Sequence, residues 1–210
     1  MNTHPLPKNL IKNYNFWKKN SFNKNKDKYK RLSKQVQKPK LMIISCCDSR
    51  IHPSLMFGDP VGNCFVYRNI ANIIPNYKKT KDMDVLAALE YGLINLKISN
   101  LVILGHSNCG GIKHAHDMFV KRKFKSKLLL INKWAQKIKP IFNRKRDLDK
   151  NLDYFEKLNV KNSINNLFEI SFIKKMIISR KLKIHGLWHD IGTGDLYFLN
   201  NKNKKFELIS

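Results

Sequence analysis

Apolar and polar positions follow one another along this chain in an order that predicts an α/β fold. Two short apolar runs, 41–45 and 101–105, end abruptly in polar residues, which is typical of buried parallel strands. Between them, leucines recur at helical spacing over 84–96. A strand, a helix and a strand in this order predict the βαβ unit of a parallel sheet. Three more strands are predicted, at 64–67, 183–188 and 196–199.

The N-terminal stretch before Pro39 has a helical pattern instead. Apolar residues repeat at helical spacing on both sides of the polar segment 23–28. The members are Leu10, Tyr14 and Trp17, followed by Tyr29, Leu32 and Val36. We predict two amphipathic helices with solvated lysines on their other faces. An arm that is this apolar on one side must dock on another surface, which either the domain that carries the motifs or a second subunit would supply.

The whole chain, 1–210, is predicted to form one domain with a mostly parallel central sheet flanked by helices. The Lys-rich stretch 121–150 is helical in pattern with a break around Pro140, and 159–181 predicts one or two further helices. We divide the domain into an N-terminal arm, a core, a helical region and C-terminal strands, at 1–38, 39–120, 121–182 and 183–210.

Residues capable of chemistry follow two of the predicted strands directly. Cys46, Asp48 and Arg50 come after the first, and His106 and Cys109 after the second. Parallel strands present their carboxyl ends at one edge of a sheet, so these side chains are expected to meet. Two sulfurs and one nitrogen suit zinc, and three protein ligands leave a fourth position open, as in catalytic sites.

The remaining cysteines and two nearby histidines are not predicted to bind metal. Cys64 lies in an apolar strand and is expected to be an inert core residue. Cys47 is expected to face away from Cys46. His114 and His116 are two residues apart, do not share a helix face and are expected to be solvated.

Composition restricts the class of protein further. The 210 residues are 42% apolar, which is enough for a full core, and the net charge of +26 would suit nucleic acid or an anionic membrane. The positive charge is nearly all Lys, is scattered, and accompanies abundant Asn and Ile, which a biased genome also produces. We therefore predict no nucleic-acid partner and no membrane partner. Without an export signal or disulfide-like cysteine spacing, a cytoplasmic location is expected.

Three motifs in order resemble the β-class carbonic anhydrases. They are Cys-x-Asp-x-Arg at 46–50, Phe-Val-Tyr-Arg-Asn-Ile-Ala-Asn at 65–72 and His-x-x-Cys-Gly-Gly at 106–111. Segments 87–91 and 185–194 are also similar to that family, so that the resemblance covers nearly the whole chain. Within the family, the chain is similar to the plant-type branch and related bacterial enzymes.

The resemblance implies an enzyme that hydrates carbon dioxide reversibly to bicarbonate and a proton. One Zn²⁺ per chain on Cys46, His106 and Cys109 would supply a zinc-bound hydroxide that attacks carbon dioxide. Asp48, held by Arg50, would accept a hydrogen bond from the zinc-bound water and orient it. In a closed state, favoured at low pH, Arg50 would let go and Asp48 would become a fourth zinc ligand.

The resemblance also implies substrate-binding residues and a partner subunit. Gln37, Phe65 and Tyr91 match the residues that surround the metal in the plant-type branch, although Phe65 and Tyr91 by themselves have the pattern of core residues. Gly110 permits close approach of the backbone and is the fourth predicted substrate contact. The family further implies a pocket at a subunit boundary, a homodimer or larger oligomer, and an N-terminal arm that packs on the partner.

Three alternatives remain open from the sequence alone. Similar proteins process carbon disulfide or carbonyl sulfide, and the motifs do not separate these substrates from carbon dioxide. A non-enzymatic basic protein could bind nucleic acid and use zinc structurally, although a fourth ligand at finger spacing is missing. A family member could also have lost its activity, but all five residues of the motif set are present.

Overall fold

The structure of the protein, a computed structural model, describes residues 3–58, 61–79, 83–123, 127–143, 147 and 149–209. The chain forms two compact units, 1–38 and 39–210. Two residues of the predicted loop 58–62 lie outside the described residues, as do seven of the predicted helical region 121–150. Among the residues that are described, no helix is long and apolar enough to cross a bilayer.

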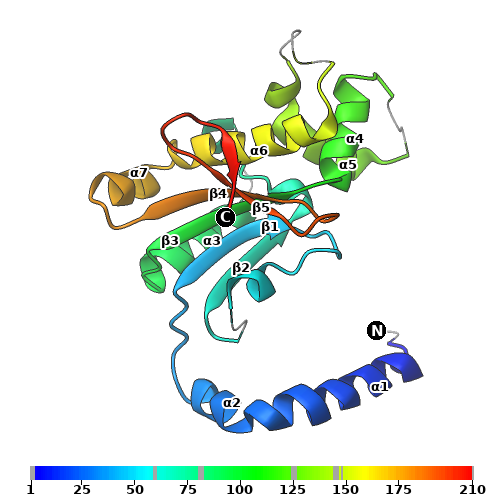
Figure 1. Ribbon diagram of the computed structural model, residues 1–210, viewed down its shortest axis with the longest axis vertical. Coiled ribbons are helices and arrows are strands. Elements are labelled where there is room, and N and C mark those ends of the chain that lie inside the picture. The colour runs from blue at the N-terminus through cyan, green and yellow to red at the C-terminus, as the bar shows by residue number, and fades with distance from the viewer. Residues whose placement is uncertain are drawn as a thin grey trace. The chain divides into compact units, whose positions relative to one another are not determined.

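The N-terminal unit is helical along most of its length. It consists of α1 (Lys8–Trp17), a π-helical segment (Lys18–Phe22), a 3-10 turn (Asn23–Asn25) and α2 (Lys26–Ser33). The two predicted helices are present, but helical turns continue into the polar segment that was expected to separate them (Figure 1). The second helix also ends earlier than the pattern predicts, since Val36 lies beyond α2 and is 78% exposed.

Aromatic rings on the two sides of the polar segment contact one another. Phe22, in the π-helical segment, lies with its ring centroid 5.7 Å from Trp17 and 4.9 Å from Tyr29. Trp17 also contacts Tyr14, at 5.9 Å between centroids. These contacts join both helices through one aromatic cluster, and ring pairs of this kind stabilise by about 0.5–1.5 kcal/mol each beyond their buried area.

The second unit is built on one six-stranded sheet with the order β2-β1-β3-β4-β5-β6 (Figure 1). The first four strands in this order are mutually parallel, and the last two pair antiparallel. The strands are β1 (Leu41–Cys46), β2 (Cys64–Asn69), β3 (Asn100–His106), β4 (Lys183–His189), β5 (Leu196–Leu199) and β6 (Phe206–Leu208). Five strands were predicted, and the short β6, which has too few residues for a periodic pattern, was not.

Strand order fixes where a site can form. β1 pairs with β2 on one side and with β3 on the other, so the chain reverses its direction of winding between β1 and β3. In sheets of this type the loops after two such strands diverge and leave a crevice at the carboxyl edge. Cys46 is the last residue of β1 and His106 is the last residue of β3.

Helices cover the sheet and follow the predicted order. They are α3 (Asp84–Glu90) with its π-helical continuation (Tyr91–Asn95), α4 (Gly110–Phe119), α5 (Leu129–Ala135) with a 3-10 continuation (Gln136–Phe142), α6 (Leu152–Leu167) and α7 (Ser171–Ile178). Short 3-10 turns occur at Pro53–Phe57, Ile70–Asn72 and Tyr77–Lys79. The predicted break around Pro140 falls inside the 3-10 continuation of α5.

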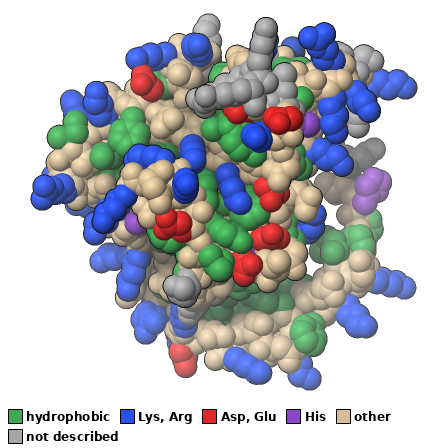
Figure 2. All heavy atoms as spheres, turned by 45° about the horizontal axis from the view of Figure 1, so that its top comes forward, with side chains coloured by type: hydrophobic (Ala, Val, Ile, Leu, Met, Phe, Trp, Pro, Cys, Tyr) green, Lys and Arg blue, Asp and Glu red, His purple; other side chains and the backbone are tan. Residues whose placement is uncertain are grey.

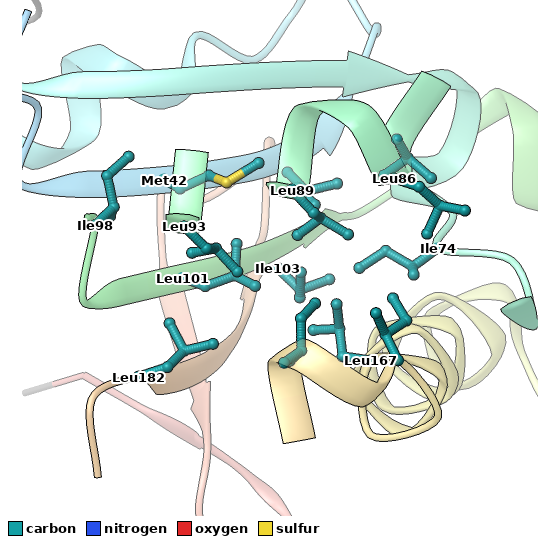
Figure 3. Close-up of a cluster of buried hydrophobic side chains, with 14 of the residues drawn as sticks. Met42, Ile74, Leu86, Leu89, Leu93, Ile98, Leu101, Ile103, Leu167 and Leu182 are labelled. Atoms are coloured by element: carbon teal, nitrogen blue, oxygen red, sulfur yellow. The ribbon is translucent and has the colours of Figure 1, made fainter. Parts of the chain in front are cut away.

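The main core lies between one face of the sheet and α3, α6 and α7 (Figure 3). Met42 of β1 and Leu101 and Ile103 of β3 point from the sheet toward Leu89 of α3 and Leu167 of α6 (Figure 3). Alternate strand residues face the opposite side of the sheet, where they form a smaller cluster of Ile43, Val102, Leu104 and Leu187.

A further cluster surrounds the carboxyl ends of β1 and β3 and corrects one prediction. His116 of α4 is not solvated, because its ring lies 5.2 Å from Phe155 and 6.2 Å from Phe142 and its side chain is only 13% exposed. His114 Nε2 lies 2.8 Å from Asn132 Oδ1 of α5. Both histidines therefore help to attach α4 to its neighbours, which the spacing of two residues could not indicate.

Candidate metal centre

The three predicted ligands meet at the carboxyl edge of the sheet. Cys46, His106 and Cys109 place their ligand atoms within 4.8 Å of one another, and all three side chains are buried. Cys46 ends β1, His106 ends β3 and Cys109 immediately precedes α4. Parallel pairing of β1 with β3 brings residues together that lie about sixty positions apart in the sequence.

The spacing of the donor atoms fits zinc. Cys46 Sγ and Cys109 Sγ are 3.9 Å apart. Two thiolates on a tetrahedral zinc ion at about 2.3 Å would lie about 3.8 Å apart. The pair is not a disulfide, since both cysteines are free.

The orientation of His106 fits zinc as well. His106 Nδ1 lies 2.9 Å from the carbonyl oxygen of Ser107, and a carbonyl can only accept, so Nδ1 carries the proton and donates it. The other nitrogen, Nε2, is buried and has no hydrogen-bond partner among the described residues. An imidazole anchored in this way presents the lone pair of Nε2 to the two sulfurs, which is the usual arrangement of a metal-bound histidine.

The pKa values of the two thiols are shifted in opposite directions. The hydrogen bond from Cys109 lowers the pKa of Cys46 to about 4, against burial, with smaller contributions from His106 and backbone N–H groups. The same bond and burial raise the pKa of Cys109, although the N–H groups of Ile112 and Gly111 favour its thiolate. A divalent cation would bind both sulfurs as thiolates, so that metal binding would release protons.

Asp48 lies beside this cluster in a bidentate pair with Arg50. Arg50 donates from Nε to Asp48 Oδ1 at 2.9 Å and from a terminal nitrogen to Oδ2 at 2.7 Å. The same guanidinium donates to the carbonyl of Asn108 at 3.0 Å, which ties the pair to the loop that carries Cys109. Asp48 Oδ2 is 4.0 Å from His106 Nε2. Hydrogen bonds from Arg50 hold the pKa of Asp48 well below its usual range.

Arg68 is a contributor that the sequence reasoning did not single out. Its guanidinium donates to the backbone carbonyls of Cys46 at 2.8 Å, Asp48 at 2.8 Å and Ile51 at 3.2 Å. The planar guanidinium of Arg68 therefore holds the backbone of residues 46–51, which carries the ligand Cys46 and the Asp48 carboxylate. The residue lies inside the segment 65–72 that supports the family resemblance, so its presence was visible but its three bonds were not.

Glu156 of α6 was missed entirely. It is buried, its Oε1 accepts from the backbone N–H of Cys109 at 2.8 Å, and its Oε2 accepts from the Trp188 indole at 3.2 Å. Burial raises the pKa of Glu156 to about 7, against the effect of these two bonds. A single carboxylate in a helix with many polar residues gives no signal by which it could have been found.

Two of the predicted substrate-binding residues, Phe65 and Tyr91, are not brought together with the metal ligands inside one chain. Phe65 is in register with Met42, four residues before Cys46, which places it about 13 Å back along the strands. Its ring lies 5.9 Å from that of Tyr91, which is 47% exposed. Gln37 is exposed and belongs to the N-terminal unit.

Gly110 does lie beside the ligands, as the first residue of α4 directly after Cys109. A Cβ at Gly110 would meet no atom within 4 Å. Steric crowding inside the chain therefore does not require glycine there. Gly111 is different, because a Cβ would lie 2.6 Å from Ile70 and 3.0 Å from the Cβ of Ala71.

Comparisons with known proteins agree with this geometry. The carbonic anhydrase family matches residues 41–196. β carbonic anhydrase 3 of Arabidopsis thaliana is 37% identical over 195 residues, which cover 89% of this chain and 74% of that protein. Among solved structures, the β-carbonic anhydrase CcaA is 26% identical with a TM-score of 0.85, covering 96% of this chain and 91% of that one. One of two tetrameric β-carbonic anhydrases of Sordaria macrospora is 28% identical with a TM-score of 0.79, covering 91% and 95%.

A three-ligand Cys–His–Cys centre at the carboxyl edge of a mostly parallel sheet has the donor set of a catalytic zinc site, with a fourth position left for water or substrate. The match of the carbonic anhydrase family to residues 41–196 and the 37% identity to the Arabidopsis protein identify the family. The chain belongs to the β-class carbonic anhydrases, and it hydrates carbon dioxide reversibly with zinc at Cys46, His106 and Cys109.

Proposed function

We propose that Asp48, held in position by Arg50, orients the attacking water during hydration of carbon dioxide at this centre. Zinc, when bound, supplies a Lewis acid that makes water nucleophilic near neutral pH. The observation that carries the proposal is the bidentate pair, which leaves the Asp48 carboxylate 4.0 Å from His106 Nε2. Because its pKa is so low, Asp48 stays an ionised acceptor throughout the working pH range.

A closed state is part of the same proposal. Asp48 would become a fourth ligand if Arg50 released it, and the Arg50 side chain is 48% exposed, so solvent can replace its bonds. The engaged pair corresponds to the open arrangement. We expect closure to be favoured at low pH and hydration to be faster at alkaline pH.

Gln37, Phe65 and Tyr91 are proposed to bind substrate in the site of a second copy of the chain. Their family match supports a role at the metal, and the distance of about 13 Å between the level of Phe65 and that of Cys46 argues against a role in the same chain. Gly110, next to Cys109, is proposed to contact substrate within its own chain. A homodimer or larger assembly with the N-terminal arm packed on the partner follows, and a relative from Sordaria macrospora is tetrameric.

We further propose a cytoplasmic enzyme with no nucleic-acid and no membrane partner. Four free cysteines support a reducing compartment. On the face drawn in Figure 2, Lys and Arg side chains are dispersed among other residues and do not gather in one patch, which supports a small anionic ligand over a polyanion. We also propose the division of the chain into an N-terminal arm (1–38), a core (39–120), a helical region (121–182) and C-terminal strands (183–210).

The test is stopped-flow hydration of carbon dioxide by the purified protein from about pH 6.5 to 9, with zinc measured on the same sample. Cys109→Ser and Cys47→Ser form a matched pair, because Cys109 is a ligand and Cys47 is an exposed neighbour of one. We expect hydration that rises toward alkaline pH, is lost on chelation of zinc and in Cys109→Ser, and is kept in Cys47→Ser.

Sulfide release from carbonyl sulfide, measured on the same sample, tests whether carbonyl sulfide rather than carbon dioxide is the substrate. One zinc per chain without hydration at any pH would contradict a carbon dioxide enzyme. Zinc with four protein ligands and tight, salt-sensitive RNA binding would favour a structural role instead.

A further inference from the structure

Helix α6 buries a stripe of polar side chains where a core helix normally presents apolar ones. Glu156, Asn159 and Ser163 are at most 2% exposed, and Asn166 is 8% exposed. Their spacing of three, four and three residues places them on one face of the helix. Because burial of unpaired polar groups is unfavourable, the partners of this stripe determine what it does.

Every member of the stripe bonds to backbone, either in the segment 71–74 or at the metal ligand Cys109. Asn159 Nδ2 donates to the carbonyl of Ala71 at 2.7 Å. Ser163 Oγ donates to the carbonyl of Asn72 at 3.2 Å and accepts from the N–H of Ile74 at 3.2 Å. Asn166 Nδ2 donates to the carbonyl of Ile74 at 2.7 Å, and Glu156 accepts from the N–H of Cys109.

The turn that these residues hold has an unusual backbone. Ala71 has φ 65° and ψ 26°, and Asn72 has φ 45°, so that two successive non-glycine residues are left-handed. The turn is fully enclosed, since Ala71 is 0% exposed and α4 approaches it closely through Gly111. A conformation of this kind persists only where surrounding contacts impose it.

The left-handed turn has a direct consequence at the metal centre. It points the N–H of Ala71 at Cys46 Sγ, 3.3 Å away. A backbone donor of this kind orients a thiolate and stabilises its charge. Two hydrogen bonds therefore connect Asn159 to the metal centre. The Asn159 side chain donates to the carbonyl of Ala71, and the N–H of Ala71 donates to the Cys46 sulfur that binds the metal.

We propose that Asn159 is a positioning residue of the metal centre, which acts by holding Ala71 in its left-handed conformation so that the Ala71 N–H donates to Cys46. The inference rests on the proposed function in that Cys46 must be a metal ligand. Asn159 itself is not one of the three metal ligands and would act only through the Ala71 backbone.

Two variants of the same helix separate positioning from general stability. Asn159→Ala and Asn166→Ala each remove one buried amide-to-carbonyl bond of 2.7 Å, but the first holds Ala71 and the second holds Ile74, three residues further from Cys46. Asn165→Ala, an exposed amide on the same helix, is the control for the loss of any asparagine. Each full-length protein is prepared with Zn²⁺ and with Co²⁺, and folding is checked by circular dichroism.

We expect Asn159→Ala to weaken zinc binding by about 10- to 100-fold in chelator competition, in line with residues that orient metal ligands elsewhere. In the Co²⁺ protein, the sulfur-to-cobalt charge-transfer band should move to longer wavelength, because Cys46 loses a hydrogen bond and becomes more electron-rich. Asn166→Ala should lose similar thermal stability but keep zinc affinity within about threefold and leave the band in place.

A second substitution tests the backbone step directly. Glycine adopts left-handed φ without strain, so Ala71→Gly added to Asn159→Ala should restore most of the zinc affinity and the band position. The inference is overturned if Asn159→Ala retains the band and the affinity of the wild type, or if Asn166→Ala changes both equally. If the wild-type protein binds no Co²⁺ or Zn²⁺, the proposed function itself fails, which is a separate result.

Discussion

At the scale of single residues, the Asp48 carboxylate gives the first prediction. Asp48→Asn keeps the size of the side chain but replaces one acceptor oxygen with a donor, so it can no longer accept from both water and Arg50 in the same way. We expect kcat/KM for hydration to fall by about 10- to 100-fold, while zinc content stays at one per chain. Stopped-flow kinetics and metal analysis on one sample measure both.

Asp27→Asn, an exposed aspartate of α2, is the matched control and should behave as the wild type. Activity within about twofold of the wild type in Asp48→Asn would contradict an orienting role. Loss of zinc along with activity would show instead that Asp48 is needed to hold the metal.

The same scale shows how far residue identity can be read from sequence. Cys46, His106 and Cys109 were predicted because few residue types bind zinc and because each lies at the end of an apolar run. Arg68 and Glu156 act mainly through bonds to backbone atoms, and these bonds depend on which backbone groups the fold places opposite each side chain. Their roles depend on where the fold places them in space, and the sequence does not state that directly.

At the scale of elements, the burial of His116 predicts that the attachment of α4 depends on pH. Burial beside Phe142 and Phe155 lowers its pKa below the ordinary value of 6.5, with Lys121 adding to the effect and Asp117 opposing it. A lowered folded-state pKa means that the neutral ring contributes stability above about pH 6.5, and that this stability is lost as the pH falls through the folded-state value.

We expect His116→Gln, which cannot titrate, to lack this part of the acid destabilisation. The free energy of unfolding in urea, measured at about pH 5 and pH 7.5, should therefore fall less in the variant than in the wild type. His4→Gln, which changes an exposed histidine, should retain the wild-type difference. Equal pH dependence in all three proteins would contradict the burial of a neutral His116.

The local pattern of apolar residues predicted where helices and strands lie better than it predicted their detailed geometry. The helix predicted over 84–96 is present, but it widens into a π-helical segment at Tyr91–Asn95. There Gly92 lies so close to the sheet that a Cβ would come within 2.8 Å of Met42 and 3.3 Å of Phe65. Periodicity along the chain contains no information on this contact between helix and strand, so it could not predict the close approach.

At the scale of the whole molecule, the separation of Phe65 and Tyr91 from the ligands predicts complementation between subunits. Cys46→Ser removes a ligand and Tyr91→Ala removes a residue proposed to bind substrate, so each homo-oligomer should have low activity. In a mixed dimer, the subunit with intact Cys46 would receive an intact Tyr91 from its partner. We expect activity to reappear when the two variants are unfolded together and refolded as a mixture.

Mixing two preparations of Cys46→Ser alone provides the baseline, and sedimentation velocity confirms assembly. Activity that stays at the baseline in assembled mixtures would place Tyr91 in the site of its own chain or outside any site. A monomer at all concentrations would contradict the proposed role of the N-terminal arm as well.

The sequence by itself determined the α/β fold, the succession of the main helices and of the strands up to β5, and the three metal ligands. These properties depend on local apolar patterns and on the rule that parallel strands share a carboxyl edge. Only the tertiary structure decided which atoms surround the ligands: the left-handed turn at Ala71, the polar stripe of α6, the fork of Arg68 and the burial of His116. Each of these results from packing between segments distant in sequence, where a residue's role is set by what lies opposite it.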